Sequence, residues 1–380
     1  MSDANIIQPV RHPTFPAGPR LSWCLGLRLP VPLLTALWFT GCASIGPGTV
    51  PRDRFDYSGS ISESWKRQTL LNIVKLRYLD PPIFVDVGQI VSGYSLETGL
   101  TVGASFPENG AFGGNTGVLG GSAKFTDRPT VTYTPLTGSK FIRALMTPLP
   151  PDSVLFTVQS GWPANAVFFA CVGVMNGLKN QETTISGVTP PDPKFLRALE
   201  LLGKIQSSGA VGMRVLQDPQ KQTTSMVTFR SKDISDQTLA DMRELRDLLH
   251  LDPEANEFKV AFGATASTEK EIALQTRSML HIMMTMAGQV DVPDVDVAQG
   301  RATPGYQGGA EADKLRLIRV QNAKSKPAEA YAAVHYRDHW FWIDDRDLRS
   351  KRAFAYMMML FTLADTGEKE NLPLITIPAQ

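Results

Sequence analysis

The sequence predicts an α+β protein with several modules, in which small antiparallel or mixed sheets are covered by helices and one long β-hairpin stands apart. Two observations predict this class. Helical stripes of apolar residues, spaced three and four positions apart, alternate along the chain with short runs of period two. Residues 93–134 also hold an unusually long alternation of apolar and small polar residues, which is typical of a strand pair.

Composition and charge limit the classes of partner. The 380 residues have a formal net charge of +1, and 43% of them are hydrophobic, which is enough to bury a core. Residues 1–41 include Arg11, Arg20, Arg28 and Asp3, so the chain without them has a net charge of −1. Nucleic-acid binding requires a cationic field. We therefore expect no nucleic-acid partner.

The first 41 residues have the pattern of a secretory signal peptide. Arg28 is followed by the apolar run Leu29–Phe39, and small residues come next. That run is too short for a transmembrane helix, which needs about 20 apolar residues. A basic flank, a short apolar core and a small-residue cleavage region together define a signal peptide.

The end of this segment, Phe39-Thr40-Gly41-Cys42, resembles the lipobox of bacterial lipoprotein precursors, although Phe39 stands where Leu is usual. The resemblance implies cleavage between Gly41 and Cys42, a diacylglyceryl group on the Cys42 sulfur and an acylated new amino terminus. Ala43 looks like the family's signal for delivery to the outer membrane. The implied location is the periplasmic face of that membrane, with lipid as the anchor. An ordinary secretory signal with an incidental cysteine is the alternative.

Cysteine usage excludes a disulfide in the mature chain. Cys24 lies in the leader and Cys42 would carry lipid, so Cys171 is the one that remains. It stands in the apolar run 168–172, where a lone cysteine is usually a small buried hydrophobe.

The predicted N-terminal module covers residues 60–180 and follows a flexible tether, residues 42–59, which has Gly, Pro and charge but no periodicity. The module is expected to contain helix 60–78, strand 83–87, the hairpin 93–134, helix 137–146, strand 154–158 and helix 162–178.

The hairpin has the clearest pattern in the mature chain. Apolar or aromatic residues at Tyr94, Leu96 and later even positions alternate with Gly, Ser, Thr and Glu. One interpretation is an arm whose apolar face packs on its own domain. Another is a membrane hairpin donated to an oligomer, because a spanning strand needs about 9–11 residues. A subunit–subunit arm is intermediate. Pro129 and Pro135 cannot donate ladder hydrogen bonds, which argues against the membrane interpretation.

Two further modules, residues 194–264 and 268–380, follow a polar, Pro-rich boundary at 181–193. The first is expected to contain helix 194–205, strands 211–216 and 225–229, helix 235–251 and strand 258–262. The second is expected to contain helix 269–286, strands 315–320 and 331–343, helix 347–364 and strand 374–377.

The expected element order αββαβ occurs three times, over residues 60–158, 194–262 and 269–377. This order is similar to that of the ring-building modules of secretion-system and sporulation ring proteins, some of which are lipoproteins. The similarity implies a helix pair that packs on one sheet face and against a neighbouring subunit.

Catalytic and metal-binding motifs are missing. The sequence has no Gly-x-Ser-x-Gly, no Gly-x-x-x-x-Gly-Lys, no Gly-x-Gly-x-x-Gly and no His-Glu-x-x-His. His335 and His339 have an even spacing within a predicted strand, which admits a shared metal or catalytic role, but packing on the sheet face is the simpler interpretation. We predict no catalytic residue, no metal and no cofactor.

The densest polar and aromatic cluster is the best candidate for ligand binding: Trp340, Trp342, Asp344, Asp345 and Arg346. Aromatic rings, carboxylates and a guanidinium group suit a polar ligand or peptidoglycan. The structural alternative is that Trp340 and Trp342 share a strand face while Asp345 or Asp347 caps the next helix. Residues 66–87 and 336–352 also look like those of uncharacterised proteobacterial lipoproteins, a resemblance that implies no known activity.

The sequence therefore predicts a non-enzymatic outer-membrane lipoprotein that acts as a structural or assembly component of a cell-envelope complex, with a homo-oligomeric ring as one form. Its expected partners are the membrane, through the lipid, and other envelope proteins or further copies of the chain. A monomeric periplasmic binding module for peptidoglycan or a polar ligand is the second class. A hydrolase is the third, although no nucleophile–base pair supports it.

Overall fold

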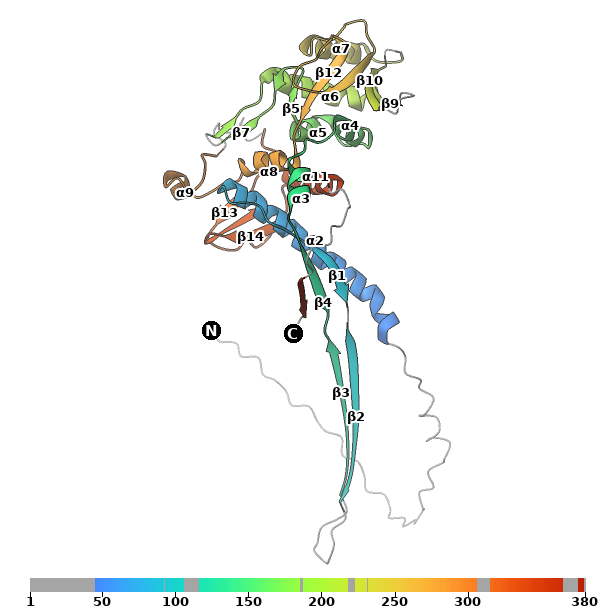
Figure 1. Ribbon diagram of the computed structural model, residues 1–380, viewed down its shortest axis with the longest axis vertical. Coiled ribbons are helices and arrows are strands. Elements are labelled where there is room, and N and C mark those ends of the chain that lie inside the picture. The colour runs from blue at the N-terminus through green and yellow to red at the C-terminus, as the bar shows by residue number, and fades with distance from the viewer. Residues whose placement is uncertain are drawn as a thin grey trace, which may run out of the picture. The chain divides into compact units, whose positions relative to one another are not determined.

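The computed structural model describes residues 45–91, 93–105, 116–184, 187–217, 223–230, 232–305, 315–364 and 375–378. Residues 51–380 form one unit, and residues 1–50 form another of which only 45–50 are described. The described chain combines helices with several small sheets (Figure 1), which confirms the α+β class.

Helix α2, Ile45–Arg77, replaces most of the expected tether. The prediction of a flexible segment over 42–59 is wrong from Ile45 onward. The outer turns of α2 are largely exposed, including the apolar side chains of Val50 and Phe55, and ion pairs such as Glu63–Arg67 stabilise an exposed helix. The apolar stripe begins only where α2 reaches the core, at Leu70 and Ile73. No helix in the described ranges has both the length and the apolar character needed to cross a membrane.

A six-stranded sheet has the strand order β6-β5-β12-β11-β10-β9. Only the β11–β12 pair is parallel, and the other neighbours are antiparallel. Its strands come from parts of the chain on both sides of the expected boundaries at 181–193 and 264–268, so these boundaries do not separate independent sheets. The strands are β5 Val172–Met175, β6 Leu178–Lys179, β9 Val211–Gln217, β10 Thr223–Phe229, β11 Glu257–Phe262 and β12 Glu271–Thr276.

Four helices supply the apolar layer that packs with this sheet: α4 Pro151–Gln159, α5 Ala164–Cys171, α6 Pro193–Ser207 and α7 Asp236–Leu248. Side-chain caps begin two of them, within one residue of the predicted starts at 194 and 235. Asp192 accepts a hydrogen bond from the Lys194 backbone N–H at the start of α6, and Ser235 accepts one from the Thr238 N–H at the start of α7. The fully buried side chains of Phe195 and Leu245 lie in this layer.

Several predicted elements around this sheet differ from the structure. The expected strand 154–158 is part of α4, because Pro151 begins a helix at its first turn and tertiary packing overrides the β-branched composition. The expected helix 269–286 divides into β12 and α8, Met279–Ala287. The expected helix 162–178 ends at Cys171, after which the chain enters β5.

Other described elements form smaller sheets and helices outside the six-stranded sheet. One sheet has the order β1-β4-β16 and another the order β13-β15-β14. The elements are β1 Phe84–Val91, β4 Thr130–Leu136, α3 Ser139–Met146, β7 Glu182–Thr184, β8 Gly187–Thr189, α9 Asp294–Ala298, β13 Gln321–Ala323, β14 Ala332–Tyr336, β15 His339–Ile343, α11 Leu348–Ala364 and β16 Ile375–Pro378.

The expected strand 331–343 is a hairpin, β14–β15, that turns at Arg337 and Asp338. The expected strand 315–320 contributes only a bridge between Val320 and Val290. The threefold αββαβ order is therefore wrong as a repeat. It is observed as α6-β9-β10-α7-β11, whereas residues 60–158 end in a helix and residues 269–377 begin with a strand.

Side-chain amides of α2 bind the edge of β1 as a neighbouring strand would. Gln68 Nε2 donates to the Val85 carbonyl at 3.1 Å and Gln68 Oε1 accepts from the Val85 N–H at 2.8 Å. One helical turn later, Asn72 makes the same pair of bonds with Ile83, at 2.7 and 3.0 Å. These four hydrogen bonds cover the beginning of an edge that would otherwise be open to other strands.

The long hairpin is confirmed as β2, Tyr94–Ser105, paired antiparallel with β3, Thr116–Asp127. Its register continues that of the outer half of β1–β4 without a shift, and the Arg128 N–H donates to the Gly93 carbonyl at the join. A single irregularity, at Gly88 in β1, precedes this continuous ladder. Figure 1 shows β2 and β3 running on from β1 and β4.

Candidate functional site

The β2–β3 hairpin, hereafter the arm, has an apolar face in the described part of its length. Leu96 lies opposite Phe125 and Thr98 opposite Ala123, so these four side chains share one face. Leu96 and Phe125 are each 50% exposed. Packing of the apolar face on the chain's own domain is therefore not observed for these side chains.

The opposite face of the arm is small and polar. Glu97 is paired with Lys124 and Gly99 with Ser122 across the two strands. A Cβ atom built on Gly99 would lie 2.8 Å from Ser122 Oγ, so a larger residue at this position would force the Ser122 side chain to rotate away. Because of this register, Leu96 and Phe125 lie on one face of the hairpin, while Glu97 and Lys124 lie on the other.

Each strand of the arm has the other as its only ladder partner among the described strands. A two-stranded ribbon without a packed face is at best marginally stable in water. Its outer edges carry backbone N–H and C=O groups that can pair with another strand. Both properties leave the described part of the arm open to pairing with another strand.

The base of the arm is connected to α2. The Tyr94 hydroxyl donates to the Asp53 carboxylate, and the Arg52 guanidinium lies 5.9 Å from the centre of the Tyr94 ring. On the arm itself, Tyr94 stacks on Phe125 with a centroid distance of 6.0 Å. These contacts link the apolar face of the arm to the outer turns of α2.

The structure places Trp340 and Trp342 on the same face of β15, half-buried. The His335 ring meets the edge of Trp340 with centroids 5.4 Å apart, and Lys326 Nζ lies 5.5 Å from the centre of the same ring. His335 and His339 lie on different strands, so the even spacing does not put them on one face of a single strand. The part of the chain that the structure describes contains no group of three or more metal-ligating side chains.

Contacts within the chain engage the charged residues that follow. Asp344 accepts a hydrogen bond from the Arg346 N–H, Asp345 pairs with Lys351, and Arg346 pairs with Glu329. Asp347, rather than Asp345, caps α11. Its carboxylate accepts from both the backbone N–H and the hydroxyl of Ser350. The charged residues of the predicted ligand cluster thus make contacts within the chain, and the neighbouring Asp347 caps the helix.

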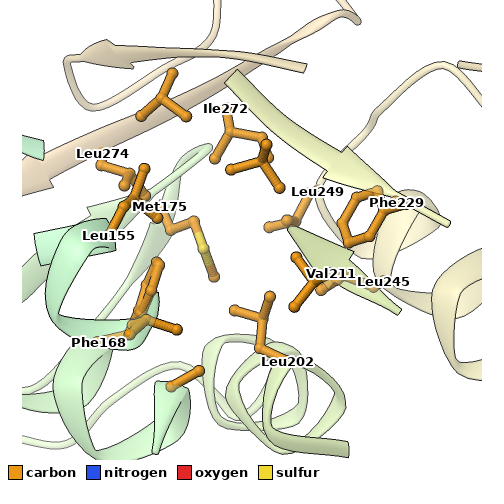
Figure 2. Close-up of a pocket in the computed structure, with 14 residues that line it drawn as sticks. Leu155, Phe168, Met175, Leu202, Val211, Phe229, Leu245, Leu249, Ile272 and Leu274 are labelled. Carbon is orange, nitrogen blue, oxygen red and sulfur yellow. The ribbon is translucent and has the colours of Figure 1, made fainter. Parts of the chain in front are cut away.

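An apolar cavity of about 50 Å³ lies between the six-stranded sheet and the helices packed on it. Figure 2 shows Met175, Leu202, Leu249 and neighbouring side chains directed into it. A drug-sized ligand site has a volume of about 300–1,000 Å³ and includes orienting polar groups. This cavity is far smaller and its lining is entirely aliphatic or aromatic, so it is a packing space in the core.

The predicted lipidation and cleavage residues, Gly41 and Cys42, lie outside the described residues, as does the whole predicted signal peptide. Their roles stay predictions from the sequence. No protein-family model, curated protein or solved structure matches this chain.

Proposed function

We propose that this chain is a lipid-anchored, non-enzymatic component of the outer membrane that assembles with further copies of itself through the arm, as in a ring. The observation that carries the proposal is a long strand pair, in continuous register, with one apolar face that a single copy leaves exposed. The lipid anchor and the membrane rest on the sequence at Phe39–Cys42 alone.

The energetics favour an arm that pairs with other arms. Burial of apolar surface contributes about 25 cal/mol per Å², and Leu96, Phe125 and their neighbours expose such surface along the ribbon. Exposed edge strands are normally protected by proline, charge or a covering element. Within β2 the only charged residue is Glu97, and the strand contains no proline. At 12 residues, each strand also exceeds the 9–11 or so required to cross a bilayer.

The test is light scattering of the full protein in mild detergent. We expect a discrete assembly, which the double variant Leu96→Lys/Phe125→Lys reduces to monomers because it places two charges on the apolar face. The matched control Thr101→Lys adds a charge to the opposite, polar face and should leave the assembly intact.

A third variant removes the arm by replacing residues 93–128 with Asn-Gly, a sequence that favours the two-residue hairpin turn. It should be monomeric and should still unfold cooperatively, since the arm contributes little to the core. A wild-type monomer, or an assembly of unchanged size without the arm, would contradict the proposal.

A further inference from the structure

Strands β1 and β2 pair with β4 and β3 along one two-stranded ribbon, whose outer edges are covered only in its β1–β4 part. On the β1 side, Gln68 and Asn72 of α2 bind the backbone of Val85 and Ile83. On the β4 side, β16 pairs with residues 130–133. No other described strand pairs with the outer edges of β2 and β3. The fold thus covers the edges at the base of the ribbon and leaves those of the arm open.

The register shows which backbone groups of the arm point outward. The Arg128 N–H donates to the Gly93 carbonyl, so these two residues form a hydrogen-bonded pair. Along an antiparallel ladder, such pairs alternate with pairs whose N–H and C=O groups point away from the partner strand. The outward-pointing pairs begin with Tyr94–Asp127, Leu96–Phe125 and Thr98–Ala123. Each outer edge of the arm therefore carries a regular row of donors and acceptors.

Proline marks the end of this open edge rather than interrupting it. Neither β2 nor β3 contains proline, and their register has no shift from Tyr94 to Ser105. Pro129 stands between β3 and β4, at a position where the alternation would direct an N–H outward, and proline has none. From Thr130 onward, β16 covers the same edge. Proline, bulges and covering elements are the usual protection of edge strands, and the arm lacks them.

Charge distinguishes the two open edges. Glu97 is the charged residue of β2, whereas β3 carries Lys124 and Asp127. Glu97 and Lys124 lie on the same face of the ribbon. Pairing of β2 with β3 of another copy places an acid and a base on adjacent strands, whereas pairing of β2 with β2 places two Glu97 side chains there. Opposite charges on adjacent strands are stabilising and like charges are destabilising, so the pattern favours contact between unlike edges.

We infer that copies of this chain join head to tail, with the outer edge of β2 in one copy hydrogen-bonded antiparallel to the outer edge of β3 in the next. This inference rests on the proposed assembly through the arm and adds which surfaces meet. Strand β16 already adds an antiparallel strand to the same side of the ribbon, at its base. After pairing, each end of the assembly keeps one open edge, so growth continues until a ring closes.

The test uses two proline variants of the full protein, studied by light scattering in mild detergent. Thr98→Pro removes an outward N–H from β2 and Ala123→Pro removes one from β3, while the hydrogen bonds between β2 and β3 within one copy are kept. Each variant alone should be monomeric, because one of the two edges is blocked in every copy. An equimolar mixture should form dimers of about twice the monomer mass, because each variant supplies the edge that the other lacks.

The matched controls are Thr98→Ala and Ala123→Ser, which change the same side chains and keep the N–H groups. Both should assemble as the wild type does, and the circular dichroism of the proline variants should match that of the wild type. Assembly of either proline variant alone, or a mixture that stays monomeric, would overturn the pairing of unlike edges. These results leave the proposed function in place if the wild type assembles, whereas a wild-type monomer contradicts both.

Discussion

Arg277 is a buried cation that is stabilised by backbone carbonyl groups rather than by a carboxylate. Its side chain is 1% exposed, and its Nη1 atom donates to the carbonyls of Phe169 and Ala170, both at 3.0 Å. These carbonyls belong to the last turn of α5, where the helix dipole favours a cation. Burial lowers the pKa of Arg277 to about 10. The guanidinium therefore completes the end of a buried helix.

Cys171 is the residue for which we predict a measurable pH dependence. It is fully buried, with Sγ 3.5 Å from the Tyr356 hydroxyl, and burial raises the pKa of the thiol from 9 to about 11. The unfolded thiol ionises near pH 9 while the folded thiol stays protonated, so this stabilisation is complete below pH 9 and is lost as the pH rises through 11. We expect the free energy of unfolding to fall by about 2–3 kcal/mol over that range.

The measurement is urea denaturation at pH 8 to 11 of the variant Cys24→Ser/Cys42→Ser, compared with the same chain carrying Cys171→Ala. Only the difference between the two curves reports on the thiol, because other groups titrate in both. A thiol reagent should label Cys171 no faster than the chain unfolds, and labelling at the rate of an exposed cysteine would refute this account.

At the scale of the element, α11 offers a comparison between two neighbouring carboxylates. The Asp347 cap satisfies the Ser350 N–H at the start of the helix, whereas Asp345 forms an ion pair whose side chains are 57% and 26% exposed. Asp347→Ala should destabilise the protein by about 1 kcal/mol, the usual loss for an N-cap. Asp345→Ala should cost less than about 0.5 kcal/mol. Urea denaturation measures both, and equal losses would contradict the assigned cap.

Elements defined by local signals could be predicted from the sequence, and those defined by tertiary context could not. The Ser235 cap and the apolar stripe of α7 lie within one short segment, so that helix is where the sequence places it. Strand β12 lies inside the segment 269–286 that the sequence predicts as a helix, and only its pairing with β11 and β5 makes it a strand. The outer half of α2 lacks an apolar stripe because it has no core to face.

The candidate sites also differ in whether local sequence signals could predict them. The arm is visible in the sequence because its alternation is continuous. A polar surface pocket lined by residues such as Asp296, Arg301, Lys324 and Arg337 was missed, because these residues are far apart in the sequence and only the fold brings them together. The one sequence signal was the Arg-Asp pair at 337–338 between two strand-like runs, which indicates a turn.

At the scale of the whole molecule, the six-stranded sheet makes the central part of the chain dependent on its neighbours. We expect the fragment 190–265 to be unfolded or aggregated, because it lacks β12 and leaves the paired edge of β11 open. The longer fragment 147–288 adds β5, β6, β12 and the helices α4, α5 and α8, and should be markedly more helical and protease-resistant. Circular dichroism and limited proteolysis provide the comparison. A folded short fragment would show that the module is autonomous.

The pairing of β16 with β4 has a consequence for the timing of folding. Thr130–Tyr133 of β4 pair with β1 on one side and with Ile375–Pro378 on the other. The ribosome adds about 5–20 residues per second, so β4 waits for tens of seconds, about 12–48 s, for the segment that completes its sheet. During that interval the base of the arm is unfinished while the arm itself is already synthesised. This edge of β4, at the base of the arm, therefore stays unpaired until residues 375–378 have been synthesised.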